Sequence, residues 1–269
     1  MKIFFDKYKL VKFVQYEKNL GFVPTMGGIH AGHISLIKKS NNHCDKTLVS
    51  IFINKPQFNK KSDYLKYPRT LKKDISVLKK IKVDYLYVPN INQIYPKRQK
   101  TKVKINSFGK KLCGKFRPVH FEAVVDVVDR FIKIIKPKKI FFGEKDMQQL
   151  KIIENFVVRN HPKIKIMGCK TIREKNGMAY SSRIFLLSPK EKLIGSSIYK
   201  LIAKNKKKLI KNNSLKKKIE MDIYKMGACK IDYFKILNIN KLTKTYKKKV
   251  KYRVFIAYYL KTTRLIDNI

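Results

Sequence analysis

Short apolar runs alternate along the first 170 residues with longer segments in which apolar side chains recur every three or four positions. The runs at 19–24, 46–54, 83–89 and 138–143 are apolar through most of their length, and 163–168 is a further predicted strand. Strands without a polar alternation are typical of a sheet that is covered on both faces. The pattern therefore predicts a buried parallel sheet.

Helices are predicted between these strands, at 31–43, 69–82, 121–136 and 143–157. Helical spacing is clearest in 121–136, which carries Phe121, Val124, Val125, Val128, Phe131, Ile132 and Ile135. Regular alternation of strand and helix favours an α/β fold with a doubly wound, Rossmann-like parallel sheet.

The pattern changes past residue 188. Amphipathic helices with very basic outer faces are followed by predicted strands at 230–238 and 251–260. This order predicts a smaller α+β domain at the C-terminal end. We expect the first domain to span 1–172 and the second 173–269.

The charge balance is unusual for a globular protein. The 269 residues include 64 Lys and Arg but only 18 Asp and Glu, which gives a net charge of +46. A nucleic-acid partner would explain this excess and would predict tight, salt-dependent binding. We favour a compositional bias that places lysine on every solvated face, because the basic residues are scattered and form no recognisable binding module. We expect no specific nucleic-acid partner.

The cysteines are far apart and form no CxxC pair, which argues against a zinc ribbon or a disulfide framework. They are Cys44, Cys113, Cys169 and Cys229. The N-terminal segment is broken by charge too often for a signal peptide, and no apolar run suits a membrane span. We expect a cytoplasmic protein without a membrane partner.

The segment Pro24–His33, PTMGGIHAGH, is nearly free of charge and follows the first of these strands. Gly27 and Gly28 allow backbone angles that other residues resist, so a ligand can approach closely. The helix start that follows is expected to offer N–H groups to a phosphate. His30 and His33 lie three apart, on one face of the first turn, where both imidazoles can donate to a phosphate that gains charge.

An HxGH motif in this position marks the nucleotidyltransferase superfamily that includes class I aminoacyl-tRNA synthetases. It indicates adenylyl or cytidylyl transfer and leaves the acceptor open. Other polar groups also fall at predicted strand ends or the adjoining loops. They are Asn54 and Gln57 in SIFINKPQF, Asp74 in YPRTLKKD, and the segments FRPVHF, FFGEKDMQQL and REKNGMAYSSR.

Taken together and in this order, these segments resemble the pantothenate synthetases, the pantoate–β-alanine ligase family. The likeness runs nearly end to end and includes a C-terminal TRLIDN. The resemblance implies that ATP and pantoate give pantoyl adenylate and pyrophosphate with Mg²⁺ assisting. β-Alanine then attacks the adenylate, which yields pantothenate and AMP. It also implies a homodimer. Because the adenylate would hydrolyse in water, we expect the small basic second domain to close over the site as a lid.

The resemblance assigns roles residue by residue. His33, His30, Lys145 and Arg183 would be catalytic, with Gln57, Gln149 and Asn54 at the substrates and Asp74 near the metal. ATP would contact Met26, Gly27, Gly28, Ile29, His30, Ala31, Gly32, His33, Gly143, Glu144, Lys145, Asp146, Ile172, Tyr180, Ser181, Ser182 and Arg183.

The sequence departs from the family pattern at three places. Val119 stands where RPGHF has glycine, Ile184 replaces the asparagine after SSR, and the proline of FVNPxQF is displaced by one in FINKPQF. These changes put local loop geometry in question but remove no residue assigned to chemistry. The alternative within the same class is another HxGH nucleotidyltransferase, against which Gln57 and Gln149 argue.

Overall fold

The computed structural model describes residues 1–96, 103–212, 214–239 and 252–269. The chain divides into two compact units. Unit 1 comprises Met1–Glu144 and Gln148–Lys170, and unit 2 comprises Lys145–Met147 and Thr171–Ile269. As a functional division into a substrate-binding domain and a lid, the split at residues 172 and 173 stays a prediction.

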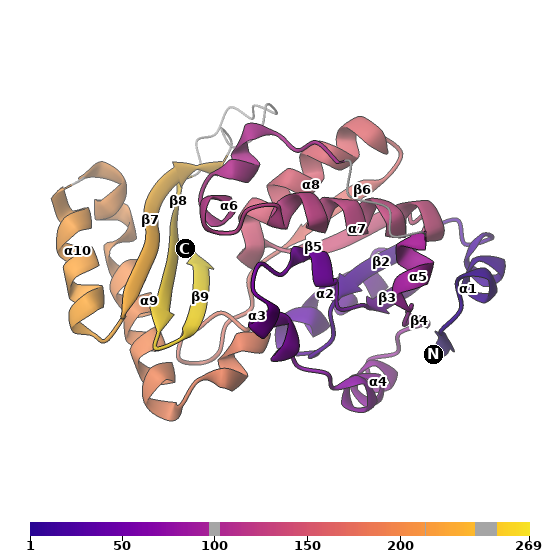
Figure 1. Ribbon diagram of the computed structural model, residues 1–269, viewed down its shortest axis with the longest axis horizontal. Helices are drawn as coiled ribbons and strands as arrows, with labels where there is room; N and C mark the ends of the chain where they lie inside the picture. Colours follow the sequence, from indigo (N-terminus) through magenta and orange to yellow (C-terminus); the bar gives the residue numbers. More distant parts are fainter. Residues whose placement is uncertain (97–102, 213, 240–251) are drawn as a thin grey trace. The chain divides into compact units, whose positions relative to one another are not determined.

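Unit 1 is built on a six-stranded sheet in which every paired strand is parallel, in the order β1-β4-β3-β2-β5-β6 (Figure 1). The strands are β1 Lys2–Phe4, β2 Leu20–Thr25, β3 Lys46–Ile51, β4 Tyr85–Tyr87, β5 Lys139–Gly143 and β6 Lys165–Cys169. The predicted α/β class with a Rossmann-like sheet is confirmed. The pattern did not predict β1.

Helices cover both faces of this sheet. In α/β folds of this type the central strand alternates its side chains between the two helical layers. Phe22 of β2 lies 5.5 Å, ring to ring, from Phe131 of helix α7. The next residue, Val23, packs in a cluster with Leu36 and Ile37 of helix α2. A strand buried on both faces has no solvated side, which explains why its sequence shows no polar alternation.

The α-helices of unit 1 are α1 Lys7–Val14, α2 Ala31–Asn41, α3 Lys61–Leu65, α4 Leu71–Lys80, α5 Ile91–Ile94, α6 Cys113–Phe116, α7 His120–Ile135 and α8 Met147–Asn160. Short 3-10 turns are η1 Lys55–Gln57, η3 Ser107–Lys110 and η4 Glu144–Asp146. The predicted helix at 143–157 was wrong at its start. The chain first makes the tight turn η4, and the α-helix begins four residues later than predicted.

The strand order reverses beside β2. From β2 the chain proceeds through β3 to β4 on one side, whereas β5 and β6 lie on the other. Ligands of doubly wound sheets bind at the carboxyl ends of the strands where the order reverses. The point of reversal here lies between β2 and β5. A Cβ atom placed on Gly143, the last residue of β5, would meet no atom within 4 Å, so this strand end is open.

Unit 2 contains an antiparallel sheet of three strands, β7 Lys230–Asn238, β8 Tyr252–Leu260 and β9 Thr263–Asn268. Two long helices, α9 Pro189–Lys211 and α10 Ser214–Lys225, lie on one side of this sheet (Figure 1). Helix α9 begins in a capping box, in which the Ser188 side chain and the Glu191 side chain each bond the other's backbone N–H. The predicted strand 251–260 is confirmed as β8, except that Lys251 lies outside the described residues. The pattern did not predict β9.

In the described part of the chain, no helix has an apolar stretch of the length that a membrane span requires. The longest, α9, spans 23 residues and is interrupted repeatedly by lysine.

Candidate active site

The turn after β2 is set by two glycines. Gly27 and Gly28 both have positive backbone angles, with φ of 82° and 63°. Side chains with a Cβ resist this region, so glycine is the residue that suits it. The Thr25 hydroxyl donates to the Ser50 carbonyl at 2.7 Å and accepts the Gly27 N–H at 3.2 Å. The turn is thereby tied to β3.

Asp74 holds the same turn from helix α4. Its carboxylate accepts the Gly28 N–H at 3.0 Å and the Ile29 N–H at 2.8 Å. The Thr70 hydroxyl donates to it at 3.1 Å. The Asp74 side chain is buried, with only 2% of the residue exposed. A buried carboxylate is stable when hydrogen-bonded to several donors, and these three supply that stabilisation.

The backbone N–H groups of the turn itself are used within the protein. Those of Gly27, Gly28 and Ile29, which precede the helix, have the acceptors named above. In the first turn of α2 the Gly32 N–H donates to His30 Nδ1 at 3.1 Å. That the helix start offers N–H groups to a phosphate stays a prediction.

His30 and His33 form a stacked pair at the start of α2. Their ring centroids are 4.0 Å apart with an interplanar angle of 27°. His30 is the N-cap residue of the helix, and its Nδ1 is the acceptor in the cap bond. A neutral imidazole that accepts at Nδ1 carries its hydrogen on Nε2. The cap bond thus fixes the His30 tautomer in which Nε2 is the donor.

A chain of hydrogen bonds orients Gln57. The Tyr95 hydroxyl donates to Asn54 Oδ1 at 2.8 Å, and burial, followed by the charge of Asp126, raises the pKa of Tyr95 above its usual value. The Asn54 amide then donates to Gln57 Oε1 at 3.1 Å and to the Ala123 carbonyl at 3.2 Å. Because Gln57 Oε1 accepts, its Nε2 must point away from Asn54.

Gln57 Nε2 lies 3.1 Å from the sulfur of Met26, at the start of the glycine turn. A thioether is a weak acceptor, so a carboxylate or hydroxyl oxygen of a ligand would be the better partner for this amide. The structure therefore brings Met26, Asn54 and Gln57 together, as a site for a small polar substrate requires.

The backbone of Gln57 is also held in place. Its carbonyl accepts from His120 Nδ1 at 2.8 Å and from Arg117 Nη2 at 3.2 Å. Arg117 Nη1 lies 3.0 Å from His120 Nε2, and a guanidinium can only donate, so Nε2 is the acceptor. This assigns a neutral His120 with its hydrogen on Nδ1. Neither Arg117 nor His120 was singled out individually from the sequence.

Two adjacent glutamines at the start of α8 differ in role. Gln148 is buried and bonds three backbone groups, accepting the Cys113 N–H and donating to the carbonyls of Phe108 and Lys111. Gln149 is partly buried, and the described part of the chain offers it no hydrogen-bond partner. This difference leaves Gln149 as the glutamine that could bind a ligand, but no contact joins it to Gln57.

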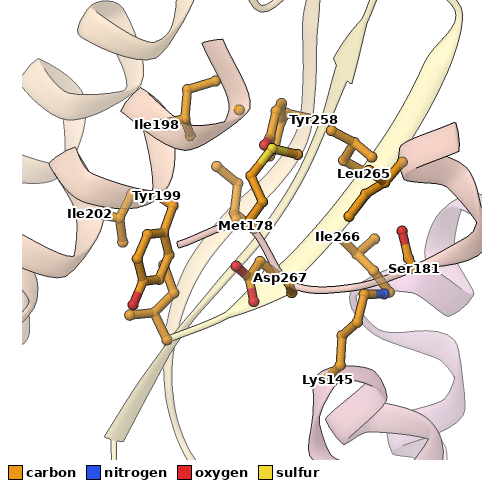
Figure 2. Close-up of a pocket in the computed structure, with 15 residues that line it drawn as sticks. Lys145, Met178, Ser181, Ile198, Tyr199, Ile202, Tyr258, Leu265, Ile266 and Asp267 are labelled. Carbon is orange, nitrogen blue, oxygen red and sulfur yellow. The ribbon is translucent and has the colours of Figure 1, made fainter. Parts of the chain in front are cut away.

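The remaining predicted ATP-site residues lie in unit 2, apart from Glu144 beside Gly143. Ile172 and Tyr180 are brought together, since the Tyr180 N–H donates to the Ile172 carbonyl at 3.1 Å. Ser182 and Arg183 begin the turn η5, Ser182–Leu186. Lys145 Nζ lies 3.9 Å from the Asp146 carboxylate. Figure 2 shows the Lys145 amine directed toward Ile266, with the Ser181 hydroxyl on a neighbouring segment.

The chain matches the family model described as pantoate-beta-alanine ligase over residues 4–269. It belongs to the pantoate–β-alanine ligase family. The resemblance expected from the motifs is therefore confirmed, and with it the class of enzyme, a ligase that forms an amide bond in pantothenate biosynthesis.

Individual members of this family are similar over nearly their whole length. A pantothenate synthetase from Pseudothermotoga lettingae is 37% identical over 97% of this chain and 94% of its own. The crystal structure of pantothenate synthetase from Thermus thermophilus has a TM-score of 0.92 at 28% identity, covering 100% of this chain and 99% of that one.

A third comparison concerns bound ligands. The crystal structure of pantoate-beta-alanine ligase from Francisella tularensis was solved as a complex with beta-gamma ATP and beta-alanine. It is 33% identical with a TM-score of 0.84 and covers 100% of this chain and 97% of its own.

The structure explains one of the departures from the ligase family pattern, Ile184, and shows the backbone conformation at a second, Val119. Ile184 is buried, with 3% exposed, in the apolar core of unit 2, where an isoleucine packs well. Val119 has φ of 62°, the left-handed region that the family's glycine would adopt without strain. The backbone keeps the shape that suits glycine even though valine occupies the position.

Whether magnesium can bind near Asp74 depends on the acceptors that remain. No group of three or more His, Cys, Asp or Glu side chains suited to a metal ion occurs among the described residues. The Asp74 carboxylate already accepts three hydrogen bonds. Mg²⁺ is commonly held by one or two carboxylates together with substrate phosphates. A single carboxylate such as Asp74 therefore fits an ion that is shared with the phosphates of ATP.

The first prediction concerns the Asp74 clamp. Asn in place of Asp74 keeps the shape of the side chain, but its amide NH₂ group would face backbone N–H groups that need an acceptor. Asp74→Asn should therefore speed amide hydrogen exchange at Gly28 and Ile29 by about tenfold or more, since a buried hydrogen bond is lost. Exchange followed by NMR checks this. Asp63→Asn, on the exposed helix α3, is the matched control, and equal exchange in the two variants would contradict the clamp.

The second prediction concerns Val119. Val119→Gly should stabilise the fold by about 1 kcal/mol, because relief of about 1–2 kcal/mol of left-handed strain exceeds the entropy cost of glycine. Val158 is the matched control, since it is equally exposed but lies within helix α8. Val158→Gly should destabilise by a similar amount. Urea unfolding of both variants measures the difference, and loss of stability in Val119→Gly would refute the strain.

Proposed function

We propose that this protein condenses pantoate with β-alanine at the expense of ATP, through a pantoyl-adenylate intermediate, and releases AMP and pyrophosphate. The observation that carries the proposal is the stacked His30–His33 pair, placed by the glycine turn at the reversal point of the sheet. The Francisella tularensis relative, crystallised with an ATP compound and β-alanine, supports the choice of ligands.

In the first step a carboxylate oxygen of pantoate attacks the α-phosphorus of ATP. The bond from that phosphorus to the oxygen bridging to the β-phosphorus breaks, and pyrophosphate leaves. Negative charge grows on the phosphate oxygens, and preorganised donors stabilise it most where they need not reorient. His30 Nε2 is such a donor because its cap bond fixes the tautomer. Charge stabilisation of this kind explains the step without proton transfer from His33.

In the second step the amine of β-alanine attacks the acyl carbon of the adenylate. The bond from that carbon to the AMP oxygen breaks, AMP leaves, and the amine proton passes to solvent or to the leaving phosphate. A free carboxylate would not react in this way, because it lacks a good leaving group. Adenylation supplies one, and exclusion of water prevents its loss by hydrolysis.

Gln57 is proposed to grip pantoate and to lie near β-alanine. Its amide donor is aimed by Tyr95 and Asn54, so a substrate oxygen meets an N–H group without a reorientation cost. Gln149 is proposed as the second pantoate contact. Unlike Gln148, its side chain is not used by the fold in the described part of the chain.

We assign Lys145 and Arg183 to the phosphates, Asp146 to the ribose side and the Ile172 backbone to adenine. Glu144, Tyr180, Ser181 and Ser182 complete the set. Arginine and lysine both suit phosphate, the first through a planar fork of donors and the second as a point charge. Unit 2 is proposed to act as the lid that excludes water.

Mg²⁺ is proposed to enter with ATP, associated with Asp74, and when bound it would neutralise phosphate charge. We further propose a homodimer in the cytoplasm. None of the four cysteines forms a disulfide, as a reducing compartment favours. With +46 on each subunit, a dimer needs apolar contact or counter-ions to offset repulsion.

The third prediction tests the reaction itself. AMP should be released from ATP only when pantoate and β-alanine are both present, because the adenylate is held until the amine arrives. Chromatographic measurement of AMP, with each acid omitted in turn, checks this. AMP release with neither acid, or with a different acid in place of pantoate, would reject the proposal in favour of another nucleotidyltransferase.

The fourth prediction concerns His33. His33→Ala should slow adenylate formation about a hundredfold or more, in line with loss of one preorganised donor to a developing charge. A single-turnover assay with ATP and pantoate measures this step alone. His43→Ala is the control, since His43 is exposed beyond the end of α2 and its side chain bonds only the Lys39 carbonyl in the described structure. Near-normal turnover in His33→Ala would remove His33 from the mechanism.

A further inference from the structure

Strand β9 ends in Asp267 and Asn268, the last residues of the TRLIDN segment, and the proposed reaction gives them no role. Asn268 is 3% exposed, and the Asp267 side chain is 12% exposed. Polar groups so deeply enclosed destabilise a fold unless they are hydrogen-bonded. Their partners therefore show what the end of the chain is built to hold.

Asp267 is fixed by Arg173. Two parallel bonds join them, from Nη1 at 2.6 Å and from Nη2 at 2.9 Å. The Arg173 guanidinium also lies 4.3 Å from the ring centre of Tyr199 and donates to the Gly177 carbonyl at 3.1 Å. Bidentate pairing and ring stacking restrict the guanidinium to one plane. Asp267 in turn accepts the Asn268 N–H at 2.7 Å, which fixes the backbone of Asn268.

The side-chain amide of Asn268 has only one possible orientation. Its Oδ1 accepts from Arg253 Nη1 at 2.6 Å, and its Nδ2 donates to the Lys145 carbonyl at 2.7 Å. A guanidinium can only donate and a carbonyl can only accept. A flipped amide would oppose donor to donor and acceptor to acceptor, so the donor must face Lys145.

Lys145 occupies a separate place in the chain. The segment Lys145–Met147 belongs to unit 2, although Glu144 before it and Gln148 after it belong to unit 1. The Lys145 side chain is 18% exposed and lines a cavity of about 30 Å³ together with Ser181 and Asp267 (Figure 2). That volume suits one or two water molecules and no substrate. The contacts around Lys145 therefore hold this residue in place and do not enclose a substrate pocket.

We infer that Asn268 is a positioning residue for Lys145, and that the Arg173–Asp267 pair and Arg253 keep its amide aimed at the Lys145 carbonyl. By fixing the Lys145 backbone, the end of β9 sets where the Lys145 ammonium lies when ATP binds. The inference rests on the proposed function, which places Lys145 on the phosphates. A small misplacement of such a group can cost about a hundredfold in rate.

The fifth prediction tests this through an isosteric change. Asn268→Asp keeps the Arg253 contact but sets a carboxylate oxygen against the Lys145 carbonyl. It should raise the Kd for ATP and lower kcat/KM for ATP, each about ten- to a hundredfold, with the KM for β-alanine unchanged. Calorimetry with ATP and steady-state AMP release measure these values. Asn268→Ala, which removes the donor without adding a repelling oxygen, should show a smaller loss and serves if the first variant does not fold.

A double-mutant cycle separates positioning from general stability. In the Lys145→Met background, either Asn268 substitution should change the Kd for ATP by less than about twofold, because the group it positions is gone. Asn205→Asp is the matched control. Asn205 also donates its amide to a carbonyl, that of Leu201 within α9. It should leave both ATP constants unchanged. Thermal unfolding of every variant records its effect on the fold.

The outcomes decide the inference. A loss of ATP affinity that is equally large in the Lys145→Met background would overturn it, and so would no loss in either Asn268 variant. Wild-type ATP affinity in Lys145→Met would also overturn it, since Lys145 would then not contact ATP. The calorimetric cycle needs ATP alone. Failure of the wild-type chain to release AMP with pantoate and β-alanine would therefore reject the proposed function separately.

Discussion

The carboxylate of Asp74 is the interaction on which the candidate site depends. It binds two successive backbone N–H groups of the glycine turn and ties the end of β2 to helix α4. A turn with two positive backbone angles has few contacts of its own, so its shape must be imposed by a neighbour. With that shape fixed, His30 can cap α2 and stack on His33.

The same logic of forced orientation recurs in both units. An amide side chain can present either a donor or an acceptor, and a neighbour with only one capability decides which. The Tyr95 hydroxyl fixes the orientation of the Asn54 amide, which in turn fixes that of Gln57. Arg253 fixes the orientation of the Asn268 amide. Burial raises the pKa of Tyr95, so its hydroxyl keeps its hydrogen near neutral pH and the orientation of Gln57 holds over that range.

Much of the fold could be predicted from the sequence because buried parallel strands leave a local signal. The predicted strand at 138–143 corresponds to β5, Lys139–Gly143. β1 spans only three residues, too few for a pattern, and the helix at 143–157 was placed too early because the turn η4 has no distinctive composition. A three-residue turn and the first turn of an α-helix accept the same residues.

The residues of the candidate site also differ in whether they could be predicted from the sequence. The glycines and histidines of one short motif could be found from the sequence, since their chemistry is unusual and close together. The bond of Asp74 to Gly28 spans 46 residues, and that of Asn268 to Lys145 spans 123. Nothing local in a sequence encodes a partner so distant. For this reason the bonds from Gly28 and Ile29 to Asp74 could not be predicted, whereas its place near a metal comes from the family resemblance and stays a prediction.

Gln148 and Gln149 show how narrowly the start of α8 is defined. Successive residues of an α-helix are about 100° apart around its axis, so one glutamine faces the fold while the other does not. Removing a single residue from η4 would turn the helix by that angle, so that Gln149 would take the buried place of Gln148 and Leu150 the place of Gln149. The Cys113 N–H would still face a glutamine, but the position now held by Gln149 would lose its amide. The length of the turn between β5 and α8 is therefore as strict a requirement as the identity of any side chain within it.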